Sequence, residues 1–537
     1  MTATAHVDTF ARDRLPPRDQ WPELLLAEPF LQYPERLNAA HALLHGAIAR
    51  GYGERPAILA QGVRWSYADL LDRAGRIARV LRDDLGMVPG NRVLLRGANT
   101  PMMAASVLAV WLAGGIVVPT MPMLRAPELA TVLERAEVNL ALCAAGLADE
   151  METARAGAPA LGTVVYFDDA ALLGHEAAMA QDGGFDAVET AADDVCLIAF
   201  TSGTTGKPKG TMHFHRDLLA AADCFPRAML QPTADDIYTG TPPLAFTFGL
   251  GAMLLFPLRY GAATVLVAKP TPAALLQAIA DFDATICSTA PTFYRQMTPL
   301  ADPGRLATLR HAVSAGEPLP LATREAWERA TGVRMTDGIG STEMLHIFIS
   351  ASGEDIRPGA TGKPVPGYSA CILDEEGRAL PPNTVGRLAV KGPTGCRYLD
   401  DTRQRDYVQD GWNVTGDAYE MDEDGYFWYR ARLDDMIVSS GYNIAGPEVE
   451  AALLRHPAVA ECAVVGWPDG ERGQIVKAFV VPREMPAAEA ALVDELQDFV
   501  RRAIAPYKYP RAIEFRTALP RTETGKLQRY KLRAGAV

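Results

Sequence analysis

A ten-residue stretch rich in glycine, hydroxyl residues and lysine constrains the fold more than any other part of the chain. It reads TSGTTGKPKG over residues 201–210 and directly follows an apolar run, Val195–Phe200. Glycine lets backbone N–H groups converge on one anion, and the hydroxyl groups, Lys207 and Lys209 add donors and charge. The pattern predicts a loop that binds nucleotide phosphates behind a buried strand. Its spacing differs from that of P-loop NTPases, and a flexible Gly/Ser/Thr linker is the disfavoured alternative.

Length and composition indicate a large enzyme rather than a disordered or disulfide-bonded chain. The chain has 537 residues, of which 48% are hydrophobic, so we expect about two to four domains. Seven cysteines are scattered and never spaced as C-x-x-C, which predicts neither a disulfide framework nor a zinc site and fits a reducing cytoplasm. The N-terminus carries charges and prolines and lacks the apolar core of a signal peptide. Residues 1–20 are predicted to be a flexible lead-in.

Two long stretches carry no charge, Gly97–Leu124 and Ile237–Leu258. Each is long enough to be considered as a membrane span. The first is divided by Pro101 and by the Gly114-Gly115 pair, which indicates a helix followed by a short Ile-Val-Val strand in a buried α/β layer. The second is broken by Pro242-Pro243 and by glycines. We therefore expect no membrane segment.

The charge of the chain is unevenly distributed. The net charge is −13 at pH 7, which argues against nonspecific nucleic-acid binding. The last 37 residues differ, because they hold ten Lys and Arg but only two acidic residues, Glu514 and Glu523. A basic patch of this kind can attract a polyanion locally, although a solvated surface would have the same composition. Composition leaves both interpretations open.

The pattern of apolar runs predicts an α/β fold up to about residue 300. Short apolar runs alternate there with helical segments, which favours mostly parallel sheets. The clearest strands are predicted at 92–95, 162–167, 195–200 and 263–267.

The pattern of predicted secondary structure changes beyond residue 360. Turn signals such as Glu376-Gly377 and Asp424-Gly425 separate short strands, which predicts a small β-rich subdomain. From about residue 435 onward, an amphipathic helix near 447–455 and strands near 463–466 and 478–481 predict a compact α+β unit.

Four further motifs follow the phosphate loop in order. They are DGIGSTE at 337–343, TGD at 415–417, RLDDMIVSSGYNIAGPEVE at 432–450 and PRTETGK at 520–526. With the loop, they resemble the motifs of the ANL superfamily of adenylate-forming enzymes, which includes acyl-CoA synthetases, adenylation domains and luciferases. The resemblance covers roughly residues 30 to 535. It implies an N-terminal AMP-binding and substrate domain over 21–433, with two α/β subdomains and a small β-rich subdomain, and a mobile α+β C-terminal domain over 434–537.

The resemblance implies roles for single residues. Glu343 would hold Mg²⁺ against the ATP phosphates, a task suited to a hard oxygen ligand, and Thr342 would bond phosphate. Lys526 would bridge the substrate carboxylate and the α-phosphate, because a mobile ammonium can neutralise two anions that must approach each other. Asp434 would be the pivot between the domains, and Gly441 would let a pantetheine arm pass close to the backbone.

The same motifs imply the remaining nucleotide contacts. Asp337 would accept the adenine amino group, Asp417 would bind both ribose hydroxyls, and Arg432 would reach the ribose or the α-phosphate. The chain departs from the family at Ile339, where many members have tyrosine, and at Val438, where some have lysine. The catalytic set implied is Lys526, Thr342, Glu343 and Arg432, with Glu343 as the metal ligand. The cofactor-binding set implied is Thr201, Ser202, Gly203, Thr204, Thr205, Gly206, Lys209, Gly316, Glu317, Asp337, Gly338, Ile339, Asp417, Arg432 and Gly441.

The choice of acid depends on the segment at 243–251, which contains Phe246, Thr247 and Phe248. Phe246 stands where the family places a gating aromatic residue or histidine, and Phe248 is a candidate wall for an aryl ring. Both could also be ordinary core residues. Amino-acid-activating members place an aspartate in this region, and its absence argues against an amino-acid substrate.

A closer resemblance points to benzoate-CoA ligases, through the string DGIGSTEMLHIF at 337–348. This string adds Gly340 and His346 to the predicted substrate pocket; for His346, orienting the substrate and packing are equally open. The stretches 392–398 and 436–446 look most like 2-aminobenzoate-CoA ligases, although neither is expected to contact the ring. The best interpretation is a ligase for 2-aminobenzoate, with benzoate or hydroxybenzoate as alternative acids. An amide-forming or carrier-protein-loading enzyme of the same superfamily is a further alternative.

An amino group on the bound ring would be a buried donor that needs an acceptor. Thr247 is the first candidate for a polar partner, and Asp223 and His346 follow. The amine could instead bond its own neighbouring carboxylate. Two other histidines, His213 and His215, could suggest a metal pair, but packing at the start of a helix is favoured because no acidic or cysteine ligand accompanies them.

The implied reaction has two halves. A carboxylate attacks ATP to give an acyl-adenylate and pyrophosphate; the C-terminal domain then rotates, and the thiol of CoA displaces AMP. The expected partners are an aryl carboxylate, ATP, Mg²⁺ and CoA, with free CoA favoured because the chain ends eleven residues after Lys526. The enzyme is expected to be a monomer or a homodimer. A noncatalytic nucleotide-binding protein is disfavoured by the presence of Glu343, Asp417, Arg432 and Lys526.

Overall fold

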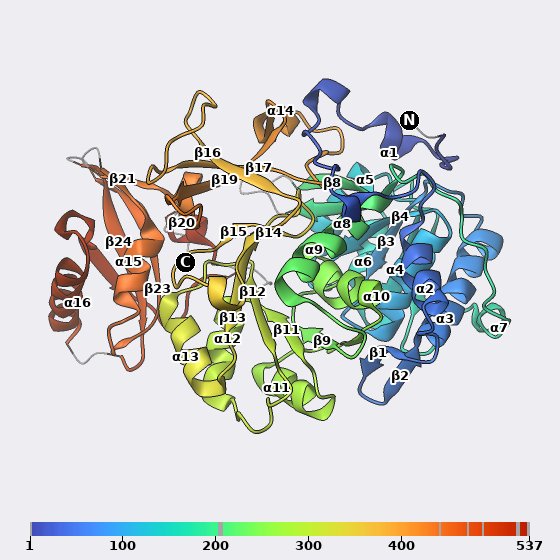
Figure 1. Ribbon diagram of the computed structural model, residues 1–537, viewed down its shortest axis with the longest axis horizontal. Helices are drawn as coiled ribbons and strands as arrows, with labels where there is room; N and C mark the ends of the chain where they lie inside the picture. The colour runs from blue at the N-terminus through green and yellow to red at the C-terminus, as the bar shows by residue number, and fades with distance from the viewer. Residues whose placement is uncertain are drawn as a thin grey trace.

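The computed structural model describes residues 3–201, 208–439, 442–469, 472–485, 488–521 and 527–533. The strands of these residues form a six-stranded sheet, a nine-stranded sheet and two five-stranded sheets. Figure 1 shows the two larger sheets and their helices as the bulk of the molecule, with the C-terminal strands and α16 at one end. This arrangement confirms the predicted α/β fold with a large N-terminal part and a small C-terminal part.

The first large sheet has six strands in the order β6-β5-β3-β4-β7-β8. Neighbouring strands are parallel except β7 and β8, which form an antiparallel hairpin. The strands are nearly all apolar because helices cover both faces of a parallel sheet. Their bounds are β3 (Arg92–Arg96), β4 (Ile116–Thr120), β5 (Leu140–Ala144), β6 (Thr163–Phe167), β7 (Val195–Thr201) and β8 (Lys209–Phe214).

The second large sheet has nine strands in the order β15-β14-β13-β12-β11-β9-β10-β1-β2. Its six central strands, from β13 to β1, are parallel, and the antiparallel strands β14, β15 and β2 lie at its two ends. Their bounds are β1 (Pro56–Ala60), β2 (Val63–Ser66), β9 (Ile237–Gly240), β10 (Ala263–Val265), β11 (Ile286–Thr289), β12 (His311–Ala315), β13 (Met335–Gly340), β14 (Ile347–Ser350) and β15 (Lys363–Pro364).

Helices fill the layers between and outside these sheets. One core cluster joins both sheets through α2, α3, α4, α8 and α10, and it includes Val93 and Leu95 of β3. Leu94 points to the opposite face of the same sheet, which α5 and α6 cover, as the alternation of side chains along a strand requires. Helices α11, α12 and α13 cover the outer face of the second sheet. The helix bounds are α2 (Ala39–Ala49), α3 (Tyr67–Arg79), α4 (Pro101–Leu112), α5 (Ala126–Arg135), α6 (Ala148–Arg155), α7 (Glu176–Met179), α8 (His215–Phe225), α9 (Thr247–Leu250), α10 (Phe256–Tyr260), α11 (Pro272–Asp281), α12 (Pro291–Met297) and α13 (Leu321–Thr331).

The first uncharged stretch folds as α4 followed by β4, as its prolines and glycines predicted. The Thr100 side chain accepts a hydrogen bond from the Met103 N–H, and Pro101 occupies the first turn, so α4 begins with a favourable cap. Gly114, with φ at 73°, lies between the helix and the strand. Among the described residues, every helix is too short or too polar to cross a membrane.

Part of the N-terminal segment packs onto the first large sheet, although a flexible lead-in was predicted over residues 1–20. Phe10 and Ala11 of α1 (Phe10–Asp13) are buried in the cluster that also contains Leu94. The Arg92 side chain is only 3% exposed and pairs with Asp8, and its guanidinium lies 4.2 Å from the centroid of the Phe10 ring. A buried charge needs such a partner. Arg92, the buried charge that this segment covers, lies outside the segment. The composition of residues 1–20 therefore could not reveal the packing.

The β-rich subdomain is a five-stranded antiparallel sheet. Gly377 and Gly425, at the two predicted turns, have φ of 84° and 81°, values that glycine adopts readily because it lacks a Cβ. The bounds of its elements are β16 (Ser369–Leu373), β17 (Gly386–Lys391), α14 (Gln404–Tyr407), β18 (Val408–Gln409), β19 (Trp412–Met421) and β20 (Phe427–Arg432).

The C-terminal α+β unit follows β20 after one short 3₁₀ turn, η9 (Leu433–Asp435). Its sheet has the order β22-β21-β24-β23, with β25 paired to β24. The predicted helix near 447–455 and the two predicted strands are present. The bounds are β21 (Ile437–Ser439), β22 (Tyr442–Ile444), α15 (Gly446–Leu453), β23 (Val459–Asp469), β24 (Gly473–Pro482), α16 (Glu489–Ala503), β25 (Ala512–Phe515) and α17 (Arg529–Arg533).

Candidate active site

The β7–β8 hairpin positions the predicted phosphate loop. Thr201 and Lys209 are partners at the last register position of the hairpin, so the loop between them begins and ends at neighbouring points. Residues 202–207, which include Ser202, Gly203, Thr204, Thr205 and Gly206, lie outside the described residues. Lys209 is the first residue of β8, and its Nζ lies 3.6 Å from Oε1 of Glu343, a residue that follows β13.

A tight turn between β13 and β14 carries Thr342 and Glu343. A Cβ at Gly340 would lie 2.6 Å from the His346 carbonyl oxygen, and one at Gly338 would lie 2.6 Å from Ile347 Cγ2. Both contacts are too short for real side chains, so glycine at both positions is what lets the two strands approach. The turn places the Glu343 side chain, which is 9% exposed, opposite Lys209.

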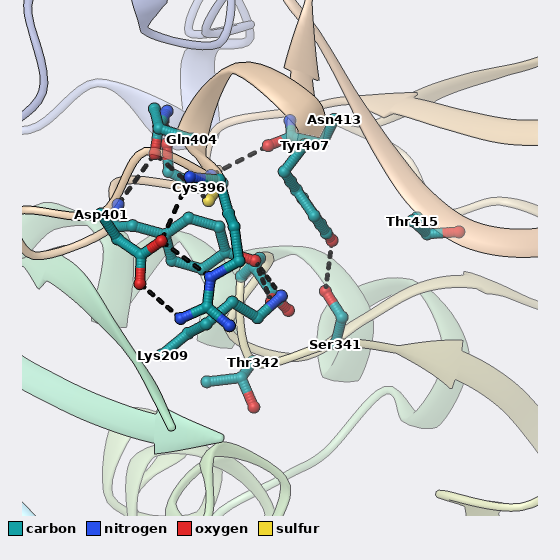
Figure 2. A network of polar contacts seen from close by, with 12 residues as sticks. Lys209, Ser341, Thr342, Cys396, Asp401, Gln404, Tyr407, Asn413 and Thr415 are labelled. Carbon is teal, nitrogen blue, oxygen red and sulfur yellow. Dashed lines mark hydrogen bonds and ion pairs between the residues drawn. The ribbon is translucent and has the colours of Figure 1, made fainter. Parts of the chain in front are cut away.

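A buried network joins Lys209 to Glu343. Lys209 Nζ donates to Tyr398 Oη at 2.7 Å, and Tyr398 Oη lies 2.6 Å from Glu343 Oε1. Lys209 Nζ and Glu343 Oε1 are 3.6 Å apart. Figure 2 shows the Tyr407 side chain, from the β-rich subdomain, directed toward Ser341, and Tyr407 Oη lies 3.3 Å from Ser341 Oγ. Three distant segments of the chain therefore meet at one carboxylate.

Asp417 and Arg432 face each other across β19 and β20. They are register partners, and Arg432 Nη1 lies 3.2 Å from Asp417 Oδ1. Gly416, with φ at 78°, lets the guanidinium lie close to the backbone, because a Cβ there would come within 3.2 Å of Arg432 Nη2. The structure thus brings together the two residues expected to contact the ribose.

Asp337 lies inside the second large sheet, where β12 and β13 pair Ser314 with Asp337. Asp337 Oδ1 is shielded from solvent and makes no hydrogen bond of ordinary geometry with the described chain. Burial raises the pKa of Asp337 to about 6, against the opposing effects of Arg324 and the Ser314 hydroxyl. A buried carboxylate oxygen without a donor suits the amino group of a base. Gly316, a predicted nucleotide contact, follows β12 with φ at 88°.

The segment at 243–251, called the acyl segment below because the choice of acid is predicted to depend on it, contains the short helix α9. Phe246 is the N-cap residue of this helix, and Thr247 is buried. Phe248 is half-buried, and its ring lies 5.5 Å from that of His346. His346 also contacts the rings of Phe225 and Phe256, at centroid distances of 5.5 Å and 4.4 Å. The predicted substrate residues Phe248 and His346 are therefore neighbours in an aromatic cluster.

His346 is 3% exposed, and neither of its ring nitrogens has a hydrogen bond of ordinary geometry within the described chain. Burial lowers the pKa of His346 to about 3, with a smaller opposing effect from the Phe248 backbone. Asp223, a runner-up for the same pocket, is already used: Arg259 binds its two oxygens at 2.8 and 2.9 Å, and Tyr33 donates to it at 2.8 Å. Asp223 is therefore a poor candidate for a substrate amine.

His213, near the end of β8, and His215, the first residue of α8, are fully buried. His213 Nε2 lies 2.8 Å from the Thr342 carbonyl oxygen, and His215 Nδ1 accepts a hydrogen bond from the Ala39 N–H at 3.1 Å. Among the described residues, no group of three or more His, Cys, Asp or Glu forms a metal site. Packing explains both histidines, and His213 in addition supports the backbone beside Glu343.

A chain of charges joins the C-terminal unit to the rest of the molecule. Glu461 of β23 contacts Arg295 of α12 at 2.6 Å and Arg521 at 3.0 Å. Arg521 also lies 3.6 Å from Glu317, a residue of the predicted nucleotide site. Glu317 accepts hydrogen bonds from the N–H and the hydroxyl of Thr292, at 3.2 and 2.7 Å.

Arg521 stands in the PRTETGK motif, five residues before the predicted catalytic lysine. Arg521 and Leu527 form an isolated β-bridge, and the Arg521 side chain lies 3.6 Å from Glu317. Lys526 itself and Gly441 lie outside the described residues, as does the side chain of Asp434. Their roles stay predictions.

Comparison with known proteins identifies the family. The model of the AMP-binding enzyme family matches residues 47–397, and the model of the AMP-binding enzyme C-terminal domain matches residues 448–526. The chain belongs to the AMP-binding enzyme family. The two matches contain the phosphate loop and Glu343 in the first and Lys526 in the second.

The sequence and structural matches between this AMP-binding enzyme and its relatives cover nearly the whole chain. A benzoate–CoA ligase from Thauera aromatica is 37% identical over 526 residues, covering 94% of this chain and 97% of the relative. The crystal structure of the anthranilate CoA ligase AuaEII in complex with anthranoyl-AMP matches with a TM-score of 0.89 at 33% identity, covering 95% of this chain and 99% of that one. A benzoate CoA ligase from Burkholderia xenovorans LB400 matches with a TM-score of 0.85 at 33% identity, covering 93% and 100%. These matches confirm an AMP-forming acid–CoA ligase, which uses ATP and CoA.

AMP-forming ligases generally require Mg²⁺, and the residues around Glu343 fit this ion. Mg²⁺ is usually held by one or two carboxylates together with substrate phosphates. The AMP-binding enzyme offers the Glu343 carboxylate 3.6 Å from Lys209, the residue that pairs with Thr201 at the end of the β7–β8 hairpin. When bound, Mg²⁺ would be held by Glu343 and would neutralise phosphate charge.

Sequence reasoning missed three residues that the structure brings to the site: Tyr398, Thr292 and Arg521. Tyr398 stands in a stretch that was noted only for its likeness to a subfamily, and Arg521 stands inside the terminal PRTETGK motif. Their contacts with Glu343 and Glu317 depend on pairing between distant segments, for which a single sequence has no local pattern.

Proposed function

We propose that this ligase activates a benzoate-type acid, with 2-aminobenzoate as the preferred substrate. In the first half-reaction, a carboxylate oxygen of the acid bonds to the α-phosphorus of ATP, and the bond to pyrophosphate breaks. In the second, the sulfur of CoA bonds to the acyl carbon, the thiol proton is lost, and AMP leaves with the electrons of the broken C–O bond. Activation as an adenylate gives the weak thiol attack a good leaving group.

The aromatic cluster beside the acyl segment is the observation that carries the aryl assignment. Phe248 extends from α9 to His346, and Phe225 and Phe256 contact the same imidazole. Flat side chains pack well on a flat substrate ring, whose edges and faces they can contact. The likeness to a benzoate–CoA ligase over most of both chains supports this assignment, and the structural likeness to an anthranilate CoA ligase supports the 2-amino group.

His346 favours a substrate with a hydrogen-bond donor on its ring. Its imidazole is neutral at physiological pH because burial lowers the pKa to about 3, and a neutral ring has one nitrogen that accepts. Neither nitrogen has a hydrogen bond of ordinary geometry within the described chain, and a buried polar group without a partner is costly. An aromatic amine near this imidazole would supply the missing donor. This argues for the orienting role of His346 over pure packing.

The residues of the nucleotide site bind and orient the two reactants. Asp417 and Arg432, paired across β19 and β20, would fix the ribose, and Lys209 would attract phosphate oxygens. Fixing both reactants converts a bimolecular attack into one between held groups. The His346 end of the site would hold the ring of the acid. We further propose that the C-terminal unit begins at residue 434 and rotates between the half-reactions.

A panel of acids tests the proposed function. The purified enzyme is incubated with ATP, Mg²⁺ and CoA together with benzoate, 2-, 3- and 4-substituted benzoates or medium-chain fatty acids, and acyl-CoA is measured by mass spectrometry. We expect 2-aminobenzoate to have the highest kcat/KM. A higher value for benzoate or a hydroxybenzoate would select that acid instead, and a preference for fatty acids would overturn the aryl assignment.

Replacing Thr247 with valine tests the polar contact to the amine. Valine keeps the shape of threonine but removes the hydroxyl, so we expect kcat/KM for 2-aminobenzoate to fall by about tenfold, equivalent to 1.4 kcal/mol. Benzoate has no amine and is the internal control, so its kcat/KM should not change. Parallel losses on both acids would indicate that Thr247 only packs, and an unchanged preference would favour His346 or an internal hydrogen bond of the substrate as the partner of the amine.

The raised pKa of Asp337 predicts a pH dependence of ATP binding. Its folded pKa of about 6 lies above the ordinary value of 3.8, so the carboxyl becomes a charged acceptor for the adenine amine only as pH rises through about 6. We expect KM for ATP to fall severalfold between about pH 5 and pH 7. The Asp337→Asn variant keeps an acceptor but cannot titrate, and its KM for ATP should lose this trend. A trend that persists in the variant would exclude Asp337 as its source.

The raised pKa of Asp337 also predicts that the stability of the nucleotide-free enzyme falls as pH rises, whereas ATP binding improves. The folded carboxyl holds its proton more tightly than the unfolded one, so its contribution to stability is full below about pH 3.8 and is lost as pH rises to about 6. Thermal unfolding of the nucleotide-free Asp337→Asn variant should therefore lack this decline. The stability and KM measurements together separate the cost of burying the charge from its use in binding.

We also propose a cytoplasmic location. All seven cysteines are described, and each is a free thiol. Six of them are buried, where burial raises the pKa of a thiol and keeps it unreactive. A reducing compartment suits this arrangement.

A further inference from the structure

Tyr398 is held rigidly at the edge of β8. It forms a β-bridge with Thr211, and the flanking backbone groups pair with the same strand: Met212 N–H donates to the Arg397 carbonyl and Leu399 N–H donates to the Gly210 carbonyl, both at 2.8 Å. The Tyr398 N–H donates to Gln404 Oε1 at 2.9 Å. Hydrogen bonds on both sides of the residue therefore fix its backbone next to Lys209.

The neighbouring residue strengthens this anchor. Arg397 is fully buried and pairs with the equally buried Asp217 at 2.9 Å, and its guanidinium lies 4.1 Å from the centroid of the Phe214 ring. Removing either partner of a buried ion pair leaves an uncompensated charge, so this pair resists movement. Tyr398 is consequently attached to a part of the fold that does not shift easily.

The contacts of the Tyr398 hydroxyl have only one consistent set of donors. A protonated lysine has no acceptor, so Lys209 Nζ donates to the hydroxyl oxygen at 2.7 Å. The single hydrogen of the phenol is then directed to Glu343 Oε1, at 2.6 Å. Hydrogen bonds to an ionised carboxylate are short and strong. The hydroxyl, 1% exposed as part of Tyr398, therefore links the predicted phosphate-binding lysine to the predicted metal-binding carboxylate.

We propose that Tyr398 is a positioning residue for Glu343, an inference that rests on the proposed function. Lys209 lies 3.6 Å from Glu343 Oε1 and partly neutralises it. When phosphate arrives, the ammonium of Lys209 is drawn toward phosphate oxygens, and Glu343 would lose this partner. The hydrogen bond from Tyr398 keeps Oε1 in place, so that the other carboxylate oxygen can face a cation. Tyr398 acts through Glu343 and has no direct contact with the reacting atoms.

The neighbouring Tyr407 provides a matched control. Its ring packs on the edge of Tyr398 with centroids 5.8 Å apart, and it is also buried. Its hydroxyl contacts Ser341 Oγ at 3.3 Å instead of Glu343. Replacing either tyrosine by phenylalanine removes one hydroxyl from the same aromatic pair, and only the Tyr398 hydroxyl bonds the carboxylate.

The test measures cation binding directly. Mn²⁺ is titrated into the full-length enzyme with ATP and without acid, and free Mn²⁺ is followed by electron paramagnetic resonance. We expect Tyr398→Phe to raise Kd for Mn²⁺ by about tenfold, the factor that corresponds to 1.4 kcal/mol, with Kd for AMP unchanged. Tyr407→Phe should leave both constants at the wild-type values. In turnover, Tyr398→Phe should raise KM for Mg²⁺ far more than it lowers kcat at saturating Mg²⁺.

The effect of Tyr398→Phe should disappear when Glu343 is already changed. In the Glu343→Gln background, adding Tyr398→Phe should leave Kd for Mn²⁺ unaltered, because the two residues act as one unit. An unchanged Kd in the single variant, or an equal change in Tyr407→Phe, would overturn the proposal. A wild-type enzyme that binds Mn²⁺ and ATP but forms no acyl-CoA from any acid would instead contradict the proposed function.

A second measurement applies if Tyr398→Phe does not fold. Enzyme with 3-fluorotyrosine at position 398 keeps the hydroxyl and reports on it by ¹⁹F NMR. We expect its resonance to shift when Mg²⁺ and ATP are added, and to shift much less in the Glu343→Gln variant. A resonance that stays in place on addition of Mg²⁺ and ATP would refute the positioning role.

Discussion

Replacing Lys526 with alanine is expected to slow acyl-adenylate formation by roughly 10²- to 10³-fold, the usual cost of losing one preorganised charge contact. The terminal PRTETGK motif implies that this ammonium lies between the substrate carboxylate and the α-phosphate. Arg521, at the start of the motif, contacts Glu317 and donates to Thr292 Oγ1. These contacts place the base of the motif at the predicted nucleotide site, which is where the lysine would be needed.

The two half-reactions are measured separately. Adenylate formation is followed by isotope exchange between pyrophosphate and ATP, and thioester formation by mixing preformed acyl-adenylate with CoA. We expect Lys526→Ala to retain most of the second activity, because the thiol attack releases AMP and brings no second anion toward the phosphate. Lys531→Ala, which changes a nearby lysine of α17, is the control and should retain both activities. Equal damage to both half-reactions would refute the role of Lys526.

Asp434→Pro is expected to keep pyrophosphate exchange while losing acyl-CoA synthesis. Position 434 lies in η9, directly after β20, and a 3₁₀ turn has φ near the value that proline imposes. In this arrangement, Arg521 lies at Glu317 and the C-terminal unit is docked against α12 through Glu461. Proline would hold φ at position 434 and so favour the arrangement in which Arg521 contacts Glu317. The second half-reaction, for which we propose a rotation at this residue, would be blocked.

Proline also restricts the preceding residue, Leu433, to extended conformations. The variant should therefore unfold at a lower temperature than the wild type, which thermal unfolding can check. Asp434→Ala leaves φ unrestricted and is the matched control, expected to carry out both half-reactions. If Asp434→Pro is folded and forms acyl-CoA at the wild-type rate, rotation at this residue must be abandoned.

The local sequence pattern was sufficient to predict the strands, helix and turns that form the framework of the site. The apolar run before the phosphate loop became β7, and the prolines and glycines at 97–124 divided that stretch into α4 and β4. Gly377 and Gly425 sit at turns with positive φ, where lack of a Cβ is a local requirement. Such features depend on neighbours a few residues away, so one sequence contains them.

Contacts between distant segments were predicted only where a family motif implied them. The N-terminal lead-in was expected to be flexible, yet Phe10 and Asp8 cover the buried Arg92. Asp223 was considered as a partner for the substrate amine, but Arg259 and Tyr33 occupy it. In both cases the deciding partner is remote in sequence, and the composition around the residue gives no indication of it.

By itself, the sequence determined the α/β framework, the order of the motifs and the residue types that nucleotide chemistry needs. Glycine conformation, strand alternation and helix caps are local, and the sequence encodes them directly. Only the tertiary structure decided that Tyr398 bonds Glu343 and that Arg521 reaches Glu317. The physical reason is that hydrogen bonds and ion pairs act over a few ångströms, and the pairing of distant strands decides which side chains come within that range.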